Sequence, residues 1–154
     1  MIFDSRLPLP PVPSTDAFTY IFYQGKREYT ENRVLYRVDG TDQTLTYRQL
    51  EQKSRQFADA IHRRYNIEPN DVVAILAKDK IQYPIAYWGA VATGAVVAPI
   101  PFPSEMSGTD VAARLEQAKA KIFITESDLL QLVGDRWSRL TKNLRNDYDP
   151  PKQN

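Results

Sequence analysis

The apolar positions in the second half of the chain form three short continuous runs separated by longer amphipathic stretches. The runs cover residues 72–76, 95–98 and 121–125, and each has the length and composition of a strand buried on both faces. Helical patterns over residues 80–93 and 110–120 lie between these runs. Strand, helix, strand, helix, strand in this order predicts a mainly parallel sheet flanked by helices, so the expected fold class is α/β.

The clearest helix of the chain begins at Thr46. The segment Thr46–Gln49 has the pattern of a capping box, in which the threonine and glutamine side chains bond to free backbone N–H groups. The residues that follow place apolar side chains at helical spacing, and Asn66 ends the pattern. The predicted apolar stripe consists of Tyr47, Leu50, Phe57, Ile61 and Tyr65.

The two helices between the strands carry start and stop signals. Asp79 and Asp110 are expected to cap them, because a carboxylate at the N-cap accepts hydrogen bonds from free backbone N–H groups. Gly94 is expected to end the first helix. That helix is apolar around most of its circumference, which predicts deep packing. A last helical pattern runs from residue 129 to about residue 140.

The first part of the chain predicts smaller elements. Residues 1–14 are rich in proline and are expected to form an extended leader, either a packed arm or a ligand of a proline-binding module. Asp16 is expected to cap a short helix that ends at Gly25 and has Phe18, Ile21 and Phe22 at helical spacing. Two short strands over 34–38 and 43–46 are predicted to pair through an Asp39-Gly40 turn.

Composition and charge narrow the function classes. The chain has 154 residues, of which 42% are hydrophobic and 25% charged, as expected for one globular domain. The formal net charge of +1 gives no global attraction to nucleic acid. The absence of cysteine excludes disulfides and a thiol nucleophile, and a single histidine leaves too few ligands for a transition-metal site.

No targeting or membrane signal is evident in the sequence. The N-terminus lacks the charge pattern of a signal peptide, and the C-terminus is not a peroxisomal address. The longest near-apolar stretch, Ile85–Ile100, falls short of the ~20 residues that span a bilayer. A cytoplasmic protein without a membrane span is therefore expected.

Two glycine-containing segments partly resemble phosphate-binding loops. Ser107–Asp110 contains part of a phosphate loop but lacks a second glycine and a lysine, so a polar loop before a capped helix is expected. Gly89 and Gly94 have the spacing of a Walker motif, but Ala95-Val96 stands where Lys-Ser/Thr is required. These glycines are expected to permit close helix–sheet packing and a turn.

The remaining polar candidates give no catalytic arrangement. Arg63–Arg64 is expected on a solvated helix face, and His62 is expected to be solvated or half-buried. Glu51, Glu116 and Glu126 are expected as single acids on the surface, each without a second acid at a spacing suited to acid–base catalysis. The sequence therefore predicts no catalytic, cofactor-binding or metal-ligating residue.

Several motifs, in order along the chain, resemble one family. Leu45–Leu50 is similar to a "T-Y-x-x-L" signature, Asn70–Leu76 to a "G-D-x-V-x-I" strand, and Tyr87–Pro99 to an "F-L-G-A-x-x-A-G-A-V-x-x-P" helix and strand. Gln117–Thr125 is similar to the strand that follows. These motifs belong to the adenylate-forming (AMP-dependent synthetase/ligase) superfamily, and the leader Ile2–Pro8 is closest to its 4-coumarate–CoA ligase-like branch.

The resemblance implies a fold, a reaction and a role for the chain. The family joins a carboxylate to ATP with Mg²⁺ and passes the acyl group to a thiol such as CoA. Its phosphate loop and catalytic lysine follow the segment that this chain resembles. The resemblance thus implies an incomplete N-terminal subdomain over residues 15–134 with a divergent polar tail over 135–154. Lys78-Asp79 stands where the family has an asparagine and a small polar residue.

Three interpretations of the chain remain open at this point. In the first, it is a truncated ligase that is inactive alone and whose partner is a full-length ligase or the missing C-terminal portion. In the second, it is a non-catalytic interaction module that docks on a ligase or synthase. In the third, it is part of a complete and active ligase.

Overall fold

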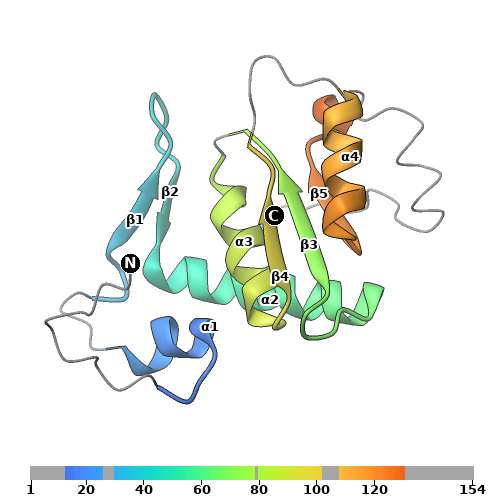
Figure 1. The fold of residues 1–154 in the computed structure, drawn as a ribbon. Helices are drawn as coiled ribbons and strands as arrows, with labels where there is room; N and C mark the ends of the chain where they lie inside the picture. The colour runs from blue at the N-terminus through green and yellow to red at the C-terminus, as the bar shows by residue number, and fades with distance from the viewer. Residues whose placement is uncertain (1–12, 26–29, 79, 102–107, 131–154) are drawn as a thin grey trace, which may run out of the picture.

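The computed structural model describes residues 13–25, 30–78, 80–101 and 108–130. Its strands form two sheets (Figure 1). An antiparallel pair consists of β1 (Val34–Arg37) and β2 (Thr44–Thr46). A parallel sheet has the order β4-β3-β5 and consists of β3 (Val72–Leu76), β4 (Val96–Pro99) and β5 (Ile122–Thr125). The predicted α/β class and parallel sheet are confirmed.

Helices cover both faces of the parallel sheet. The described helices are α1 (Ala17–Thr19), the π-helical turn η1 (Tyr20–Gln24), α2 (Tyr47–Tyr65), α3 (Gln82–Ala92) and α4 (Gly108–Ala118), and residues 127–130 are also helical. None of the described helices combines the length and the apolar character that crossing a membrane requires.

The side chains of β3 show how the layers are built. Val73 and Ile75 pack in a core with residues of α2 and α3, whereas Ala74 and Leu76 pack in a second core with residues of α4. Successive side chains of a strand point to opposite faces, so α2 and α3 lie on one side of the sheet and α4 on the other. A third core joins α1, η1 and β2 to α2 and α3.

The N-terminus of α2 has the predicted capping box. The Thr46 hydroxyl accepts a hydrogen bond from the Gln49 N–H at 3.3 Å, and the Gln49 side-chain oxygen accepts one from the Thr46 N–H at 3.0 Å. Asn66 ends the helix in the left-handed region with φ 48°. The predicted stripe faces the cores, with Phe57 and Tyr65 half-buried, and Ser54 and Ala58 are buried as well.

The first helix starts as predicted and then widens. Asp16 accepts a hydrogen bond from the Thr19 N–H at 2.8 Å. From Tyr20 the turn is π-helical, and Gly25 closes it with a 2.7 Å bond to the Tyr20 carbonyl. The wider turn changes the angular spacing of the side chains. Ile21 is 39% exposed, whereas Phe18 and Phe22 are buried.

The start of α3 differs from the prediction. Asp79, the predicted cap, lies outside the described residues. The helix begins at Gln82, and the residue before it, Ile81, makes no side-chain capping bond. A turn closed by a 3.0 Å bond from the Tyr83 N–H to the Lys80 carbonyl precedes it. Pro84 falls in the first helical turn, where its missing N–H costs nothing.

Two further expectations fail for positional reasons. Strand β4 is not buried on both faces: Val96 is 50% exposed, because the strand order places β4 at the edge of the described sheet. Helix α4 begins at Gly108, so Asp110 lies in its first turn and is not its N-cap. A negative charge in the first turn still interacts favourably with the helix dipole.

Other predictions cannot be compared with the fold. Most of the predicted leader, the predicted helix beyond residue 130 and the predicted tail over 135–154 lie outside the described residues. The domain boundaries at residues 14 and 134 therefore stay predictions.

Candidate functional site

The carboxyl ends of β3 and β5 lie next to each other and form the best candidate site. Leu76 and Thr125, the last residues of these strands, are register partners. From β3 the chain crosses to β4 on one side and then returns to β5 on the other, so the strand order reverses between β3 and β5. In open parallel sheets, ligands bind in the crevice at such a topological switch point.

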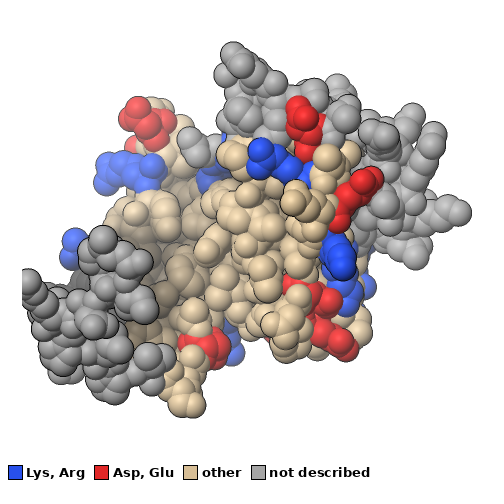
Figure 2. Space-filling model, viewed as in Figure 1, with Lys and Arg blue, Asp and Glu red and all other residues tan. Residues whose placement is uncertain are grey.

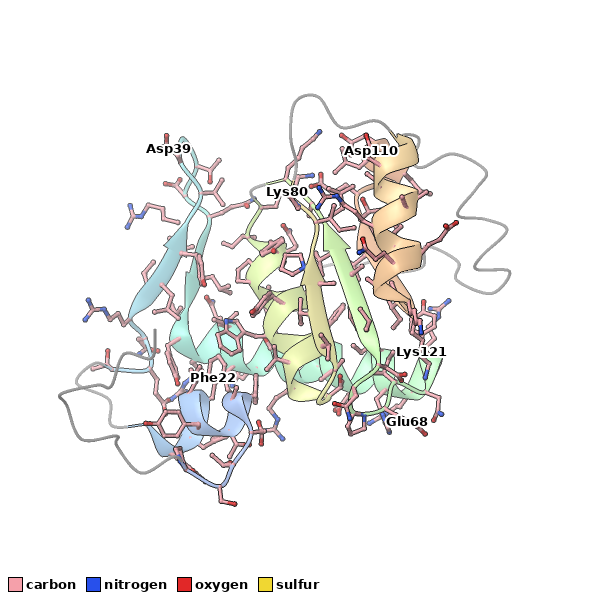
Figure 3. The ribbon with its side chains drawn as sticks, viewed as in Figure 1. Phe22, Asp39, Glu68, Lys80, Asp110 and Lys121 are labelled. Atoms are coloured by element: carbon pink, nitrogen blue, oxygen red, sulfur yellow. The ribbon has the colours of Figure 1, made fainter. Side chains whose placement is uncertain are left out.

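Four charged side chains surround this switch point. We call Lys78, Lys80, Glu126 and Asp128 the switch-point cluster. The Lys78 N–H donates to the Glu126 carboxylate at 2.7 Å, and the Lys78 ammonium lies 2.5 Å from an oxygen of Asp128. The Lys80 ammonium pairs with Glu126. Figure 3 shows Lys80 at the same end of the sheet as Asp110, opposite the end with Glu68 and Lys121.

The charge pairs of the cluster stabilise one another. The hydrogen bond from Lys78 lowers the pKa of the Asp128 carboxyl, and Asp128 in turn raises the pKa of the Lys78 ammonium. Both side chains are about half exposed, and ion pairs in such positions contribute little to the free energy of folding. The ion pairs of the cluster therefore connect the loops that follow β3 and β5, and they add little to the stability of the core.

The donors at this edge do not fit a triphosphate. Binding one requires several converging backbone N–H groups and an available cation. The ammonium groups of Lys78 and Lys80 already face carboxylates, and the Lys78 N–H is already bonded. The buried hydroxyl of Thr125 finds no hydrogen-bond partner among the described residues, and it offers a place for only one polar group. The described part of this edge is therefore unsuited to ATP.

The described residues also contain no cluster of the usual metal-ligating side chains. A magnesium ion takes carboxylate, carbonyl and water oxygens in an octahedral arrangement. The described residues contain no group of three or more histidine, aspartate or glutamate side chains close enough to hold a metal. The two carboxylates of the cluster face lysines.

Gly89 and Gly94, which have the spacing of a Walker motif, permit close helix packing and a turn. A Cβ at Gly89 would lie 2.5 Å from the Phe57 ring and 2.8 Å from the Ser54 carbonyl, so Gly89 lets α3 approach α2. The expected helix–sheet contact is thus a helix–helix contact. Gly94 has φ +79° and forms the predicted turn before β4. Of the Ser107–Asp110 segment, Ser107 lies outside the described residues.

The other weighed residues are spread over the surface. His62 is exposed, and its Nδ1 lies 2.9 Å from the Ile67 carbonyl. Arg63 and Arg64 lie on the solvated face of α2, as predicted. Glu51 is half-buried, pairs with Arg55 at 3.5 Å and accepts a hydrogen bond from the Tyr23 hydroxyl. Glu116 is exposed on α4.

The sequence prediction for Glu126 is wrong. Glu126 is not a single surface acid: it is half-buried, bonds to Lys78 and Lys80, and has Asp128 beside it in the cluster. The partners come from a loop 48 residues earlier in the chain, as the spacing of Lys78 and Glu126 shows. The available signal was topological, since residues that follow parallel strands meet at the carboxyl edge of the sheet.

The chain is similar to a family of AMP-binding enzymes and to several known ligases. The model of the AMP-binding enzyme family matches residues 22–153. The 4-coumarate-CoA ligase 1 of Narcissus pseudonarcissus is 29% identical over 128 residues, which are 82% of this chain and 22% of that protein. The long-chain-fatty-acid–CoA ligase of Haemophilus influenzae is 36% identical over 67 residues, 42% of this chain and 12% of that protein.

The fold agrees with this similarity. The solved structure of a benzoate CoA ligase from Burkholderia xenovorans superimposes with a TM-score of 0.68 and 23% identity, over 80% of this chain and 24% of that chain. The chain thus spans less than a quarter of each of these three proteins. Because the family model covers most of its length, the chain belongs to the AMP-binding enzyme family, also called the adenylate-forming superfamily.

Proposed function

We propose that this chain is the first part of the catalytic domain of an ATP-dependent acid–thiol ligase. The observation that carries the proposal is the family match over residues 22–153, supported by the shared three-layer fold. The proposed reaction joins a carboxylate oxygen to the α-phosphate of ATP and releases pyrophosphate. The thiol of CoA then attacks the acyl carbon and releases AMP.

The proposed acid is an aryl or acyl carboxylate, and the proposed branch is the 4-coumarate–CoA ligase-like one. The match with the Narcissus ligase covers 82% of this chain, which supports that branch. The stronger but shorter match with a long-chain-fatty-acid–CoA ligase keeps aliphatic acids within the proposal. A non-catalytic module docking on a synthase is not favoured, because the family similarity extends over most of the chain.

The proposed role of this chain within the enzyme is structural. The donors and cations of the switch-point cluster do not fit a triphosphate, because its ammonium groups already face carboxylates. ATP, Mg²⁺ and CoA would then be held by the remainder of the catalytic domain. We therefore expect the isolated chain neither to bind ATP nor to exchange pyrophosphate.

A chimera tests the ligase proposal directly. Replacing the matching segment of the Narcissus ligase with this chain should retain ATP–pyrophosphate exchange with 4-coumarate, benzoate or a long-chain fatty acid. The unmodified Narcissus ligase is the positive control, and the isolated chain is the negative control. A chimera without exchange on any of these acids would contradict the proposal, and saturable ATP binding by the isolated chain in calorimetry would contradict its structural role.

A further inference from the structure

The exposed apolar side chains of the described residues are concentrated in the first part of the chain. Seven large hydrophobic residues are exposed, and six of them come from η1 and β1. The seven are Tyr20, Ile21, Tyr23, Val34, Leu35, Tyr36 and Val96. Single exposed apolar residues are ordinary on protein surfaces, but a concentration of them marks an interaction site.

Strand β1 is open on both faces. All four of its residues are exposed, although Tyr36 and Arg37 are consecutive, regularly paired with β2 and project to opposite sides of the ribbon. Figure 1 shows the β1–β2 hairpin standing clear of the parallel sheet. The burial of β2 is different, since Leu45 in its centre is 1% exposed and packs against η1 and α2. The hairpin therefore packs on the core through β2, whereas the side chains of β1 are exposed.

One edge of β1 is also unpaired within the described residues. β1 pairs with β2 through Val34↔Thr46, Tyr36↔Leu45 and Arg37↔Thr44, with an irregularity between Val34 and Tyr36. In the described part of the chain no strand lies along its other edge. Free backbone groups on a strand edge accept another strand, and a two-stranded ribbon is at best marginally stable in water.

The charge distribution around the hairpin fits a protein interface. Figure 2 shows a largely uncharged surface between the hairpin and β4, with lysine, arginine and acidic side chains mainly around its periphery. Val96 of β4 is the remaining exposed large apolar residue. The core of a specific interface is depleted of charged residues, and its rim is polar.

The edge of β4 is less suited to adding a strand than the edge of β1. Pro99 belongs to β4 and is followed closely by Pro101, and proline has no N–H to donate to a neighbouring strand. β1 contains no proline, and its sequence Val-Leu-Tyr-Arg is rich in residues that favour strands. Of these two edges, β1 offers the better template.

We propose that the β1–β2 hairpin is the docking site for the remainder of the AMP-binding catalytic domain, which adds a strand along the free edge of β1 and covers both of its faces. This inference rests on the proposed function. The chain spans 24% of the Burkholderia ligase structure, so most of a fold of that kind lies outside the segment that this chain matches. A second copy of the chain could supply one strand, but its own hairpin would leave the faces of β1 uncovered.

Complementation in trans tests this surface. The chain is co-expressed with the remainder of the Narcissus ligase, that is, with that enzyme lacking the segment that matches this chain. The expected result is a soluble 1:1 complex in size-exclusion chromatography with light scattering. Amide hydrogen exchange of residues 34–37 should become at least about 10-fold slower in the complex, because new strand hydrogen bonds protect these amides.

Matched variants locate the contact. Leu35→Lys and Tyr36→Lys each place a charge on one face of β1 and should each weaken the complex at least about 10-fold. Ala60→Lys makes the same charge change on the exposed face of α2 and should leave it unchanged. The isolated variants should melt within a few degrees of the parent chain, since β1 is already exposed.

Three results would overturn the docking proposal. One is no complex, or no soluble remainder, on co-expression. Another is a complex that the hairpin variants leave intact. The third is a symmetric dimer of the chain itself that Leu35→Lys dissociates, which would make a second copy the occupant. Each is distinguishable from failure of the ligase proposal, because the chimera joins the two parts covalently and reports pyrophosphate exchange.

Discussion

Strands β3 and β1 have similar apolar character and opposite surroundings. β3 lies in the middle of its sheet between two layers of helices, and Val73 and Ala74 have no exposed surface. β1 lies at an edge, and every one of its residues is exposed. The difference between Val-Val-Ala-Ile-Leu and Val-Leu-Tyr-Arg does not explain this contrast. The elements that pack against each strand explain the contrast. The apolar side chains of β1 are therefore best explained by contacts with another part of the fold.

The largest expected effect comes from truncating a side chain of β3. Ile75→Ala removes a side chain that is 1% exposed in the core between β3 and α2 and α3. The lost burial and the cavity should lower the free energy of unfolding by about 2–5 kcal/mol. Urea unfolding followed by circular dichroism measures this change.

The matched change in β1 sharpens the contrast. Leu35→Ala removes as many carbon atoms from a residue that is 39% exposed and should change the free energy of unfolding of the isolated chain by no more than about 0.5 kcal/mol. Equal losses for the two variants would mean that β1 is already packed in the isolated chain.

A loss smaller than that of Ile75→Ala is expected where α2 and α3 approach each other. Gly89→Ala places a methyl group 2.5 Å from the Phe57 ring and 2.8 Å from the Ser54 carbonyl. The backbone carbonyl cannot move as a side chain can, so overpacking should cost about 1–3 kcal/mol despite the better helix propensity of alanine. Phe57→Leu in the same chain should recover part of the loss. A more stable Gly89→Ala chain would show that the two helices are not in close contact.

The cap of α2 should contribute about 1 kcal/mol. Thr46→Ala removes the hydroxyl that accepts the Gln49 N–H. Such N-cap substitutions usually lower the free energy of unfolding by about 0.5–2 kcal/mol. Thr46→Ser keeps the acceptor and should restore most of the stability. If serine and alanine lower the urea midpoint equally, the hydroxyl does not act as a cap.

The smallest effect concerns the switch-point cluster and depends on pH. Asp128→Asn removes the charge that pairs with Lys78 and should lower the urea midpoint slightly at pH 7 and low salt. Because the pKa of Asp128 is lowered in the folded state, its contribution is present above the ordinary value of 3.8 and is lost as the pH falls below it. The difference between the two chains should therefore vanish in acid and in high salt. A difference that persists in 1 M salt would contradict an electrostatic origin.

The local signals of the sequence predicted most of the fold. The capping box at Thr46, the strand of residues 72–76 and the turn at Gly94 depend on neighbouring residues, and all three have their predicted form. The errors arise where contacts between residues far apart in the sequence determine burial and packing. Val96 is exposed because no described strand lies beyond β4, and Gly89 permits a helix–helix contact where a helix–sheet contact was expected.

The candidate site was less accessible to prediction. Glu126 could not be paired with Lys78 and Lys80 from their positions, because the two loops meet only through the order β4-β3-β5. Periodicity gives the strands and helices but not the order of strands in a sheet. The resemblance to a family indicated the fold, and it contained no information on this cluster.

Native-state amide hydrogen exchange of the isolated chain compares the two strands most directly. The amides of residues 72–76 should exchange only through global unfolding, whereas those of residues 34–37 should exchange through local opening at least about 100-fold faster. Equal protection of the two strands would contradict the description of β1 as a surface that the rest of the domain must cover.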